Sequence, residues 1–314
     1  MQEVAKMARG RNGWFIPENT LLSLQKIAEN YLNFDKLTQF LNKYPEVDAP
    51  RKVGVVMAGN VPAVGFHDAL CVLLSGHKLM AKVSKDDTPL ILFMLETLKK
   101  VEPNFKEEIQ FVERINEADA YIATGSDNTA RYFEYYFAKK PHIIRKNRNA
   151  VSIIEGDESS EVLTALGGDI LTYFGLGCRN VSKLYVPAGY DFSKLYEALE
   201  SKRSFYANHH KYFNNYEYNR SILLVNGTPH YDNGFLMFTE SEAIISPLSV
   251  VYYESYDSLP QLIAELDTQN EKIQCIVADP EKIPGAVPFG QAQSPGLDDF
   301  ADGVDTMAFL TNLE

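Results

Sequence analysis

The sequence predicts an α/β protein of 314 residues with a parallel sheet buried between helices. From residue 51 onwards, short apolar runs rich in β-branched residues alternate with helical patterns, which is typical of right-handed βαβ units. Three expected strand ends carry polar or glycine-containing turns, namely Gly59-Asn60, Ser84-Lys85-Asp86 and Thr124-Gly125-Ser126. Ligands of parallel sheets bind at the carboxyl ends of the strands. These turns therefore predict a binding site at one edge of the sheet.

The elements of the first half follow from the spacing of apolar residues. Residues 15–45 are expected to be helical, because Pro17-Glu18-Asn19-Thr20 is typical of a helix start and leucines follow at helical spacing. The expected strands are 52–57, 78–83, 109–112 and 120–123, and the expected helices are 64–74 and 88–101.

A second block of alternating elements begins after about residue 150. Its expected strands are 151–154, 183–186, 221–225, 250–253 and 273–277, and its expected helices are 161–172 and 194–201. The apolar tail, residues 306–313, is expected to be a terminal strand. Such a strand has an unpaired edge that could pair with another chain, and an internal edge strand is an equal alternative.

Composition excludes several classes of protein. The formal net charge of −12 argues against general nucleic-acid binding and against docking on anionic membranes. The longest apolar runs are far shorter than the roughly 20 residues that span a bilayer, and the first residues contain no apolar signal core. Three cysteines are too few for a disulfide framework. A reducing, cytoplasmic location is therefore expected.

One of the three cysteines has the surroundings of a nucleophile. Cys71 and Cys275 lie in apolar runs and are expected to be buried small hydrophobes. Cys178 instead follows Gly175 and Gly177, which allow a ligand to approach the backbone, and Arg179 favours the thiolate. A thiolate attacks carbonyl carbons. A tight turn that happens to contain a cysteine is the alternative interpretation.

Three segments carry a family resemblance. Residues 174–187 (FGLGCRNVSKLYVP) resemble the nucleophile segment of the aldehyde dehydrogenase superfamily, and residues 59–89 and 288–310 resemble its acyl-CoA reductase (LuxC-like) branch. The resemblance implies an aldehyde-dehydrogenase-like fold of two α/β domains, in which a Rossmann-like parallel sheet binds the nucleotide. Residues 1–150 would form N-terminal helices and the nucleotide-binding domain, 151–290 the catalytic domain, and 291–314 the segment with the oligomerisation strand. The start of the chain looks short for the family.

The resemblance also implies the catalytic groups. Cys178 matches the family's nucleophile, and Asn60 matches the asparagine whose amide helps to form the oxyanion hole. The second donor would be the backbone N–H of Cys178. An amide placed where negative charge develops is worth about 3 kcal/mol of transition-state stabilisation. A turn cap after the first strand is the alternative for Asn60.

Four further residues match the family's cofactor site. Lys82 and Ser84 match the pair at a strand end that binds the adenosine ribose or its 2′-phosphate, and a solvated strand end is their alternative. Gly125 and Ser126 match the turn beneath the pyrophosphate. A helix is expected to start just after them, and the free N–H groups of helix N-termini bind phosphate. NADP(H), with NAD(H) as the alternative, is the implied cofactor.

The general base of hydrolytic aldehyde dehydrogenases is missing. Residues 145–149, at the matching place, contain no carboxylate, and Glu155 lies too late in the chain to replace it. Because water needs a base near neutral pH, hydrolysis of an acyl-enzyme should be slow, which argues for its reduction by hydride. The same region is basic, so Arg145 and Arg148 are hypothesised to contact the phosphates of coenzyme A or of the cofactor. A solvated positive turn is the alternative.

These observations predict NADPH-dependent reduction of a fatty or other acyl-CoA to an aldehyde through an acyl-cysteine. The alternatives are the reverse reaction of a CoA-acylating aldehyde dehydrogenase, reduction of an acyl phosphate, a cysteine-dependent acyl transferase without nicotinamide, and a non-catalytic scaffold. His67 and the pair His209-His210 lack metal-ligand spacing, so no metal is expected. A homo-oligomer, dimer or tetramer, is expected from the resemblance and the terminal strand.

Overall fold

The chain folds into two compact units. The structure, a computed structural model, describes residues 1–125 and 127–313. The first unit consists of Met1–Asn147 together with Pro295–Glu314, and the second consists of Arg148–Ser294. None of the helices in the described part of the chain has the length and apolar character that a membrane crossing requires.

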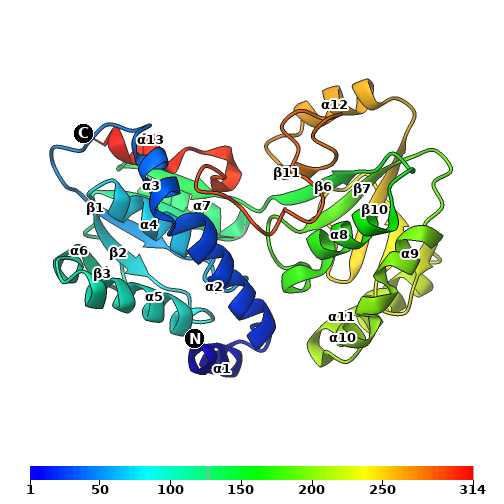
Figure 1. The fold of residues 1–314 in the computed structure, drawn as a ribbon, viewed down its shortest axis with the longest axis horizontal. Coiled ribbons are helices and arrows are strands. Elements are labelled where there is room, and N and C mark those ends of the chain that lie inside the picture. The colour runs from blue at the N-terminus through cyan, green and yellow to red at the C-terminus, as the bar shows by residue number, and fades with distance from the viewer. Residues whose placement is uncertain (126, 314) are drawn as a thin grey trace. The chain divides into compact units, whose positions relative to one another are not determined.

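The first unit contains a parallel sheet of five strands (Figure 1). The strands are β1 (Lys52–Val56), β2 (Lys78–Lys82), β3 (Ile109–Phe111), β4 (Ala120–Thr124) and β5 (His142–Arg145). The predicted parallel sheet is confirmed, and only β5 was not expected from the sequence. The order β3-β2-β1-β4-β5 reverses direction between β1 and β4, which makes this place the topological switch point where such sheets bind ligands.

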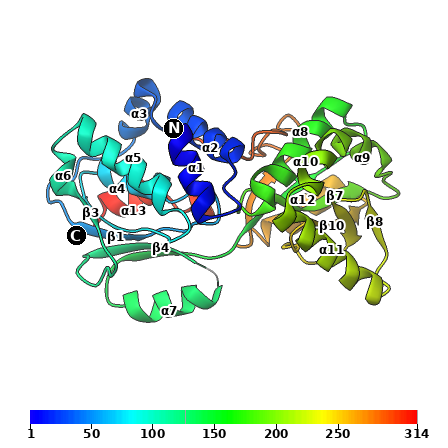
Figure 2. The same cartoon turned by 90° about the horizontal axis from the view of Figure 1, so that it is seen from below.

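Helices cover both faces of this sheet. α4 (Phe66–Leu74) and α5 (Thr88–Val101) lie over one face and α7 (Asp127–Phe137) over the other, as Figure 2 shows. Apolar side chains of these helices pack against the sheet. Before residue 147 the first unit also contains α1 (Gln2–Arg11), α2 (Pro17–Tyr31), α3 (Phe34–Leu41) and the short α6 (Phe105–Glu108). The expected helical region 15–45 is broken between α2 and α3, where the Asn33 side chain caps α3 by accepting the Lys36 N–H.

The C-terminal segment of the first unit is helical. The terminal strand expected over residues 306–313 is wrong, because α13 (Thr306–Thr311) occupies this place after the 3₁₀ turn η3 (Ala301–Gly303). Asp305 caps α13 by accepting the Ala308 N–H at 2.8 Å. Met307 and Leu310 face the core at helical spacing. An apolar run this short is compatible with either a strand or a helix. Here the Asp305 cap and the packing against the core favour the helix.

A buried arginine joins this segment to the sheet. Arg145, at the end of β5, is 2% exposed, and its guanidinium donates to Asp68 Oδ1 at 2.7 Å and to Thr306 Oγ1 at 2.8 Å. It also donates to the carbonyl oxygen of Ala301. A buried charge needs such partners, because an unpaired one costs several kcal/mol. Arg145 therefore links the end of β5 to α4 and to the start of α13 within the first unit.

The second unit is built on a mixed sheet of six strands. These are β6 (Asn149–Ile153), β7 (Val181–Pro187), β8 (His230–Asp232), β9 (Met237–Glu240), β10 (Val250–Tyr256) and β11 (Ile273–Val277), in the order β11-β6-β7-β10-β9-β8. Among these pairs only β8 and β9 are antiparallel. The helical elements are α8 (Ser160–Leu171), η1 (Thr172–Gly175), α9 (Ser193–Leu199), η2 (Glu200–Lys202), α10 (Arg203–Ala207), α11 (His210–Val225) and α12 (Leu259–Asp267).

The strand expected over residues 221–225 is also wrong, because these residues form the last turns of α11. The helix begins after His209, whose ring accepts the Tyr212 N–H, and it continues through the apolar run to Val225. Leu224 and Val225 are 56% and 86% exposed. A helix that has already begun adds residues at low cost, which overrides the weak strand preference of this run.

The Arg145–Asp68 ion pair should be essential to the stability of the first unit. Asp68→Asn leaves the buried guanidinium without its anion and should lower the free energy of unfolding by about 3 kcal/mol, measured by urea denaturation. The control is Asp298→Asn, which breaks the exposed pair of Lys43 and Asp298 and should cost less than about 1 kcal/mol. Equal small losses in both variants would contradict this role of Arg145.

Candidate functional site

The ends of three strands in the first unit meet at one edge of the sheet. Val56, the last residue of β1, pairs with Lys82 of β2 on one side and with Ala123 of β4 on the other. Parallel strands in this register end level with one another. The turns that contain Asn60, Ser84 and Gly125 therefore follow the same edge of the sheet, where the sequence predicted a binding site. The topological switch point lies at this edge, between β1 and β4.

The turns after β1 and β2 are in direct contact. A Cβ atom at Gly59 would lie 2.3 Å from Ser84 Oγ, so that only glycine allows this approach. Ser84 orders its own turn, since its Oγ accepts the Asp86 N–H and its carbonyl oxygen accepts the Thr88 hydroxyl at 2.8 Å. Asn60 and Lys82 are exposed, so their polar groups are accessible to a ligand.

Two buried side chains hold the turn that follows Asn60. Ser23 Oγ, from α2, donates to the carbonyl oxygen of Pro62 at 2.6 Å, and Asp87 Oδ2 accepts the Ala63 N–H at 2.9 Å. Ala63 adopts a left-handed conformation with φ of 58°, which is uncommon for a residue other than glycine. Burial raises the pKa of Asp87 to about 8, although the hydrogen bond from Ala63 acts to lower it. The sequence analysis singled out neither Ser23 nor Asp87.

The turn after β4 leads directly into a helix. Gly125 packs against α7, because a Cβ atom on it would lie 3.0 Å from Thr129 Cβ. α7 begins at Asp127, one residue before the earlier of the two expected starts, Asn128 and Thr129. Ser126, the other residue predicted here, lies outside the described residues.

In the second unit, Cys178 lies in a turn that follows a strained stretch of backbone. Tyr173, Phe174 and Gly175 have φ values of 55°, 59° and 76°, so three consecutive residues are left-handed. For the two aromatic residues this costs about 1–3 kcal/mol each, and such strain clusters at functional sites. Packing offsets it, since the Phe174 ring stacks on His209 with a centroid distance of 4.2 Å.

Asn180 closes the turn around Cys178. Its Oδ1 accepts the Gly177 N–H at 2.8 Å, while its Nδ2 lies within hydrogen-bonding distance of the carbonyl oxygens of three residues, Asp169, Ile170 and Thr172. Asn180 is 1% exposed, so these bonds are protected from water. Cys178 itself is partly exposed, as is Cys275, whereas Cys71 is buried and burial raises the pKa of its thiol.

The residues beside Cys178 hold a second loop in place. Arg179 Nε donates to the carbonyl oxygen of Ala292 at 2.6 Å. The Asp169 carboxylate accepts the Gly290 and Ala292 N–H groups at 2.6 and 3.0 Å. Burial raises the pKa of Asp169 to about 6 despite these two N–H groups, which lower it. The loop around Gly290 therefore lies next to the Cys178 turn, a contact between segments more than 100 residues apart.

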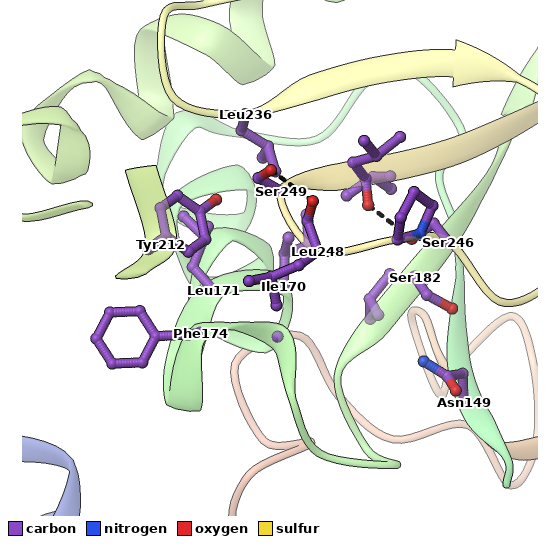
Figure 3. Close-up of a pocket in the computed structure, with 15 residues that line it drawn as sticks. Asn149, Ile170, Leu171, Phe174, Ser182, Tyr212, Leu236, Ser246, Leu248 and Ser249 are labelled. Atoms are coloured by element: carbon purple, nitrogen blue, oxygen red, sulfur yellow. Dashed lines mark hydrogen bonds between the residues drawn. The ribbon is translucent and has the colours of Figure 1, made fainter. Parts of the chain in front are cut away.

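A small cavity lies behind this turn (Figure 3). Its volume is about 30 Å³, and its lining includes Phe174, Gly175, Asn149 and Ser249. The buried Tyr212 hydroxyl, which also lines it, has no hydrogen-bond partner among the described residues. This space suits a water molecule and is too small for an acyl chain.

The structure argues against a ligand contact of Arg145. Its guanidinium is buried and bound to Asp68, Thr306 and Ala301, so it cannot reach a phosphate without breaking these contacts. Arg148 is partly exposed and donates to the carbonyl oxygen of Asn270 at 3.0 Å, so its phosphate contact stays a prediction.

The histidines that the sequence singled out have structural contacts. His67 Nε2 lies 3.0 Å from the carbonyl oxygen of Leu297, and burial lowers its pKa. In the described part of the chain, no three His, Cys, Asp or Glu side chains are grouped so that they could bind a metal ion.

The first unit contains a parallel sheet of the kind that binds nucleotides, and the second α/β unit has a cysteine in a polar turn. Together these two features define an aldehyde-dehydrogenase-like protein. The profile of the family "Acyl-CoA reductase (LuxC)" matches residues 20–211, and the chain belongs to this family. A comparison with functionally curated proteins gave no match.

Several solved structures that share this fold are aldehyde dehydrogenases. A mutant betaine aldehyde dehydrogenase from Staphylococcus aureus is 14% identical with a TM-score of 0.63, covering 93% of this chain and 69% of the other. The Bacillus cereus enzyme, in complex with NAD⁺, is 13% identical with a TM-score of 0.59, covering 88% and 67%. The Mycobacterium tuberculosis enzyme, also complexed with NAD⁺, is 14% identical with a TM-score of 0.56, covering 89% and 72%. At these identities the likeness shows the fold.

The buried carboxyl of Asp87 should make stability depend on pH. Its pKa is about 8 in the folded protein and about 3.9 in an unfolded chain, so between these values only the folded state keeps the proton. Raising the pH through this window therefore favours unfolding. The Asp87→Asn variant cannot ionise at this position. The difference between its free energy of unfolding and that of the wild type, measured by urea denaturation, should therefore shift in favour of the variant from pH 5 to pH 8. A difference that stays constant with pH would contradict the raised pKa.

Proposed function

We propose that this protein reduces an acyl-CoA thioester to the aldehyde, with NADPH as reductant and an acyl-Cys178 intermediate. The observation that carries the proposal is Cys178, a partly exposed thiol in a turn closed by the buried Asn180, in a chain of the acyl-CoA reductase family. Side-chain hydrogen bonds that fix a turn before any ligand binds are what a positioned nucleophile requires.

The first half of the reaction is acyl transfer. The Cys178 thiolate attacks the thioester carbonyl carbon, and negative charge develops on the carbonyl oxygen. The Cys178 N–H and the Asn60 amide stabilise this oxyanion. Collapse of the tetrahedral intermediate breaks the bond to the coenzyme A sulfur, which leaves as a thiolate and takes up a proton. The product of this half is a thioester of Cys178.

The edge of the sheet in the first unit fits a nicotinamide dinucleotide. Gly59 brings the Asn60 turn against Ser84, and Gly125 brings the β4 turn against α7, so both turns lie close to the elements that follow the sheet edge. The N–H groups at the start of α7 would bind the pyrophosphate, and Lys82 and Ser84 would bind the adenosine ribose or its phosphate. When bound, the cofactor supplies the hydride that converts the acyl-cysteine into an aldehyde.

The local charges favour reduction over hydrolysis. The segment 145–149 contains no carboxylate. Glu155, which follows β6, forms an ion pair with Lys282 at 2.8 Å, and its backbone N–H donates to Glu158. Without a general base, water attacks a thioester slowly near neutral pH. The acyl-enzyme then persists long enough to be reduced, and the reverse reaction, formation of acyl-CoA from an aldehyde, would use the same residues.

Assembly and location remain proposals. The expected terminal strand is absent, because α13 packs against the core of the first unit. A homo-oligomer is therefore proposed from the family resemblance alone. A cytoplasmic location is proposed from the small number of cysteines in the sequence, three in all.

Replacing the nucleophile tests the reaction directly. Cys178→Ala should abolish aldehyde formation from acyl-CoA and NADPH, because no acyl-enzyme can form. Mass spectrometry of the wild type incubated with acyl-CoA alone should show the acyl group on Cys178. Cys275→Ala, which removes the other partly exposed thiol, is the matched control and should keep the wild-type rate. Aldehyde formation by Cys178→Ala would refute the proposal.

The preference for NADPH is tested at Lys82. This exposed lysine would pair with the 2′-phosphate, which NADH lacks. Lys82→Ala should raise the KM for NADPH by about fivefold, equivalent to roughly 1 kcal/mol for an exposed charge pair. The KM for NADH should change less than twofold. A wild type that prefers NADH, or equal increases in both KM values, would exclude this role of Lys82.

A further inference from the structure

Asp87 occupies the capping position of a helix without capping it. It is the N-cap residue of α5, yet its side chain makes no capping hydrogen bond to that helix. Aspartate at this position normally accepts an N–H from the first turn, which stabilises the helix by about 1 kcal/mol. Asp87 instead points to Ala63, 24 residues earlier, and accepts its N–H at 2.9 Å. Because the side chain binds this distant partner and not its own helix, its structural role is to hold the turn at Ala63.

The turn that Asp87 holds is the one that begins at Asn60. Ala63 is 1% exposed and left-handed, so its N–H is shielded from water and needs an acceptor from within the protein. Ser23 holds the preceding residue, Pro62, from the side of α2. The turn is thus held at two successive residues by two buried side chains from different elements. Asn60, where the turn begins, is exposed, whereas Pro62 and Ala63 are buried.

Burying the Asp87 carboxyl group destabilises the fold. Asp87 is 0% exposed, and its Oδ1 has no hydrogen-bond partner among the described residues. A buried polar atom left without a partner destabilises the fold, and an apolar side chain at this position would avoid that cost. The one contact that an apolar side chain could not make is the bond to the Ala63 N–H.

We propose that Asp87 is a positioning residue that fixes the Asn60 turn and so places the Asn60 amide for oxyanion stabilisation. The inference rests on the proposed function. Asp87 touches neither substrate nor cofactor in this role and acts only through the backbone of Ala63. Loss of its hydrogen bond would let the left-handed turn relax, and a displacement of about 1 Å at a stabilising group can reduce a rate about 100-fold.

The test compares two replacements of Asp87. Asp87→Ala removes the acceptor, whereas Asp87→Asn keeps an oxygen that can accept the Ala63 N–H. With saturating acyl-CoA and NADPH near pH 7, Asp87→Ala should lower kcat by about 10- to 100-fold, because oxyanion stabilisation acts on the transition state. Its KM for NADPH should stay within about threefold of the wild type. Asp87→Asn should restore kcat to within about threefold.

Hydrogen exchange gives a readout that does not depend on activity. In Asp87→Ala the amide of Ala63 should exchange at least tenfold faster, while the amides of β1 keep their protection. Asn33→Ala, which removes a true N-cap from α3, is the matched control for the loss of a capping residue and should change neither kcat nor the Ala63 amide. Should Asp87→Ala fail to fold, Ser23→Ala removes the other anchor and should lower kcat in the same direction by a smaller factor.

The outcomes separate the two proposals. A wild type that makes no aldehyde refutes the proposed function, and the catalytic part of this inference falls with it. An active wild type whose kcat is unchanged in Asp87→Ala refutes the positioning role alone. Unaltered exchange at Ala63 overturns the structural basis of the inference in either case. A KM effect equal to the kcat effect would also overturn it, because it would indicate a general loss of the cofactor edge.

Discussion

The level ends of parallel strands are the constraint on which the first unit depends. β1 pairs with β2 and β4 so that Val56 stands beside Lys82 and Ala123, and the chain leaves all three strands at one edge. The strand pairing alone therefore makes residues that are far apart in the sequence neighbours, and no ligand is needed for this. The contact between Gly59 and Ser84 is a direct result, and it allows no side chain at position 59.

Buried polar side chains then give each turn one conformation. Asn180 bridges the Cys178 turn to the end of α8, Asp169 holds Gly290 and Ala292, and Asp87 holds Ala63. Each of them binds backbone groups, while Asn60 and Gly290 in these loops are exposed and Cys178 is partly exposed. This division separates two tasks, because the buried side chain determines the geometry and the exposed residue is available for chemistry.

Much of this arrangement could be predicted from the sequence, for identifiable reasons. The sheet of the first unit follows from alternating apolar runs, and the turns at its edge follow from the rule for parallel strands. The C-terminal tail and residues 221–225 could not be predicted, because short apolar runs suit a strand or a helix equally, and the cap at Asp305 and the long helix begun at His210 decide. The burial of Arg145 could not be predicted either, because its partner Asp68 lies 77 residues away in the sequence.

The residues that the sequence did not reveal share one physical property. Ser23, Asp87, Asp169 and Asn180 are all buried polar side chains whose partners are backbone groups of another segment. Backbone groups are the same at every position, so no second residue type marks such a contact in the sequence. A cysteine beside glycines can be recognised from the local sequence pattern, whereas the side chains that position it depend on the tertiary fold. Both buried acids have raised pKa values because the fold places them away from water to reach those backbone groups.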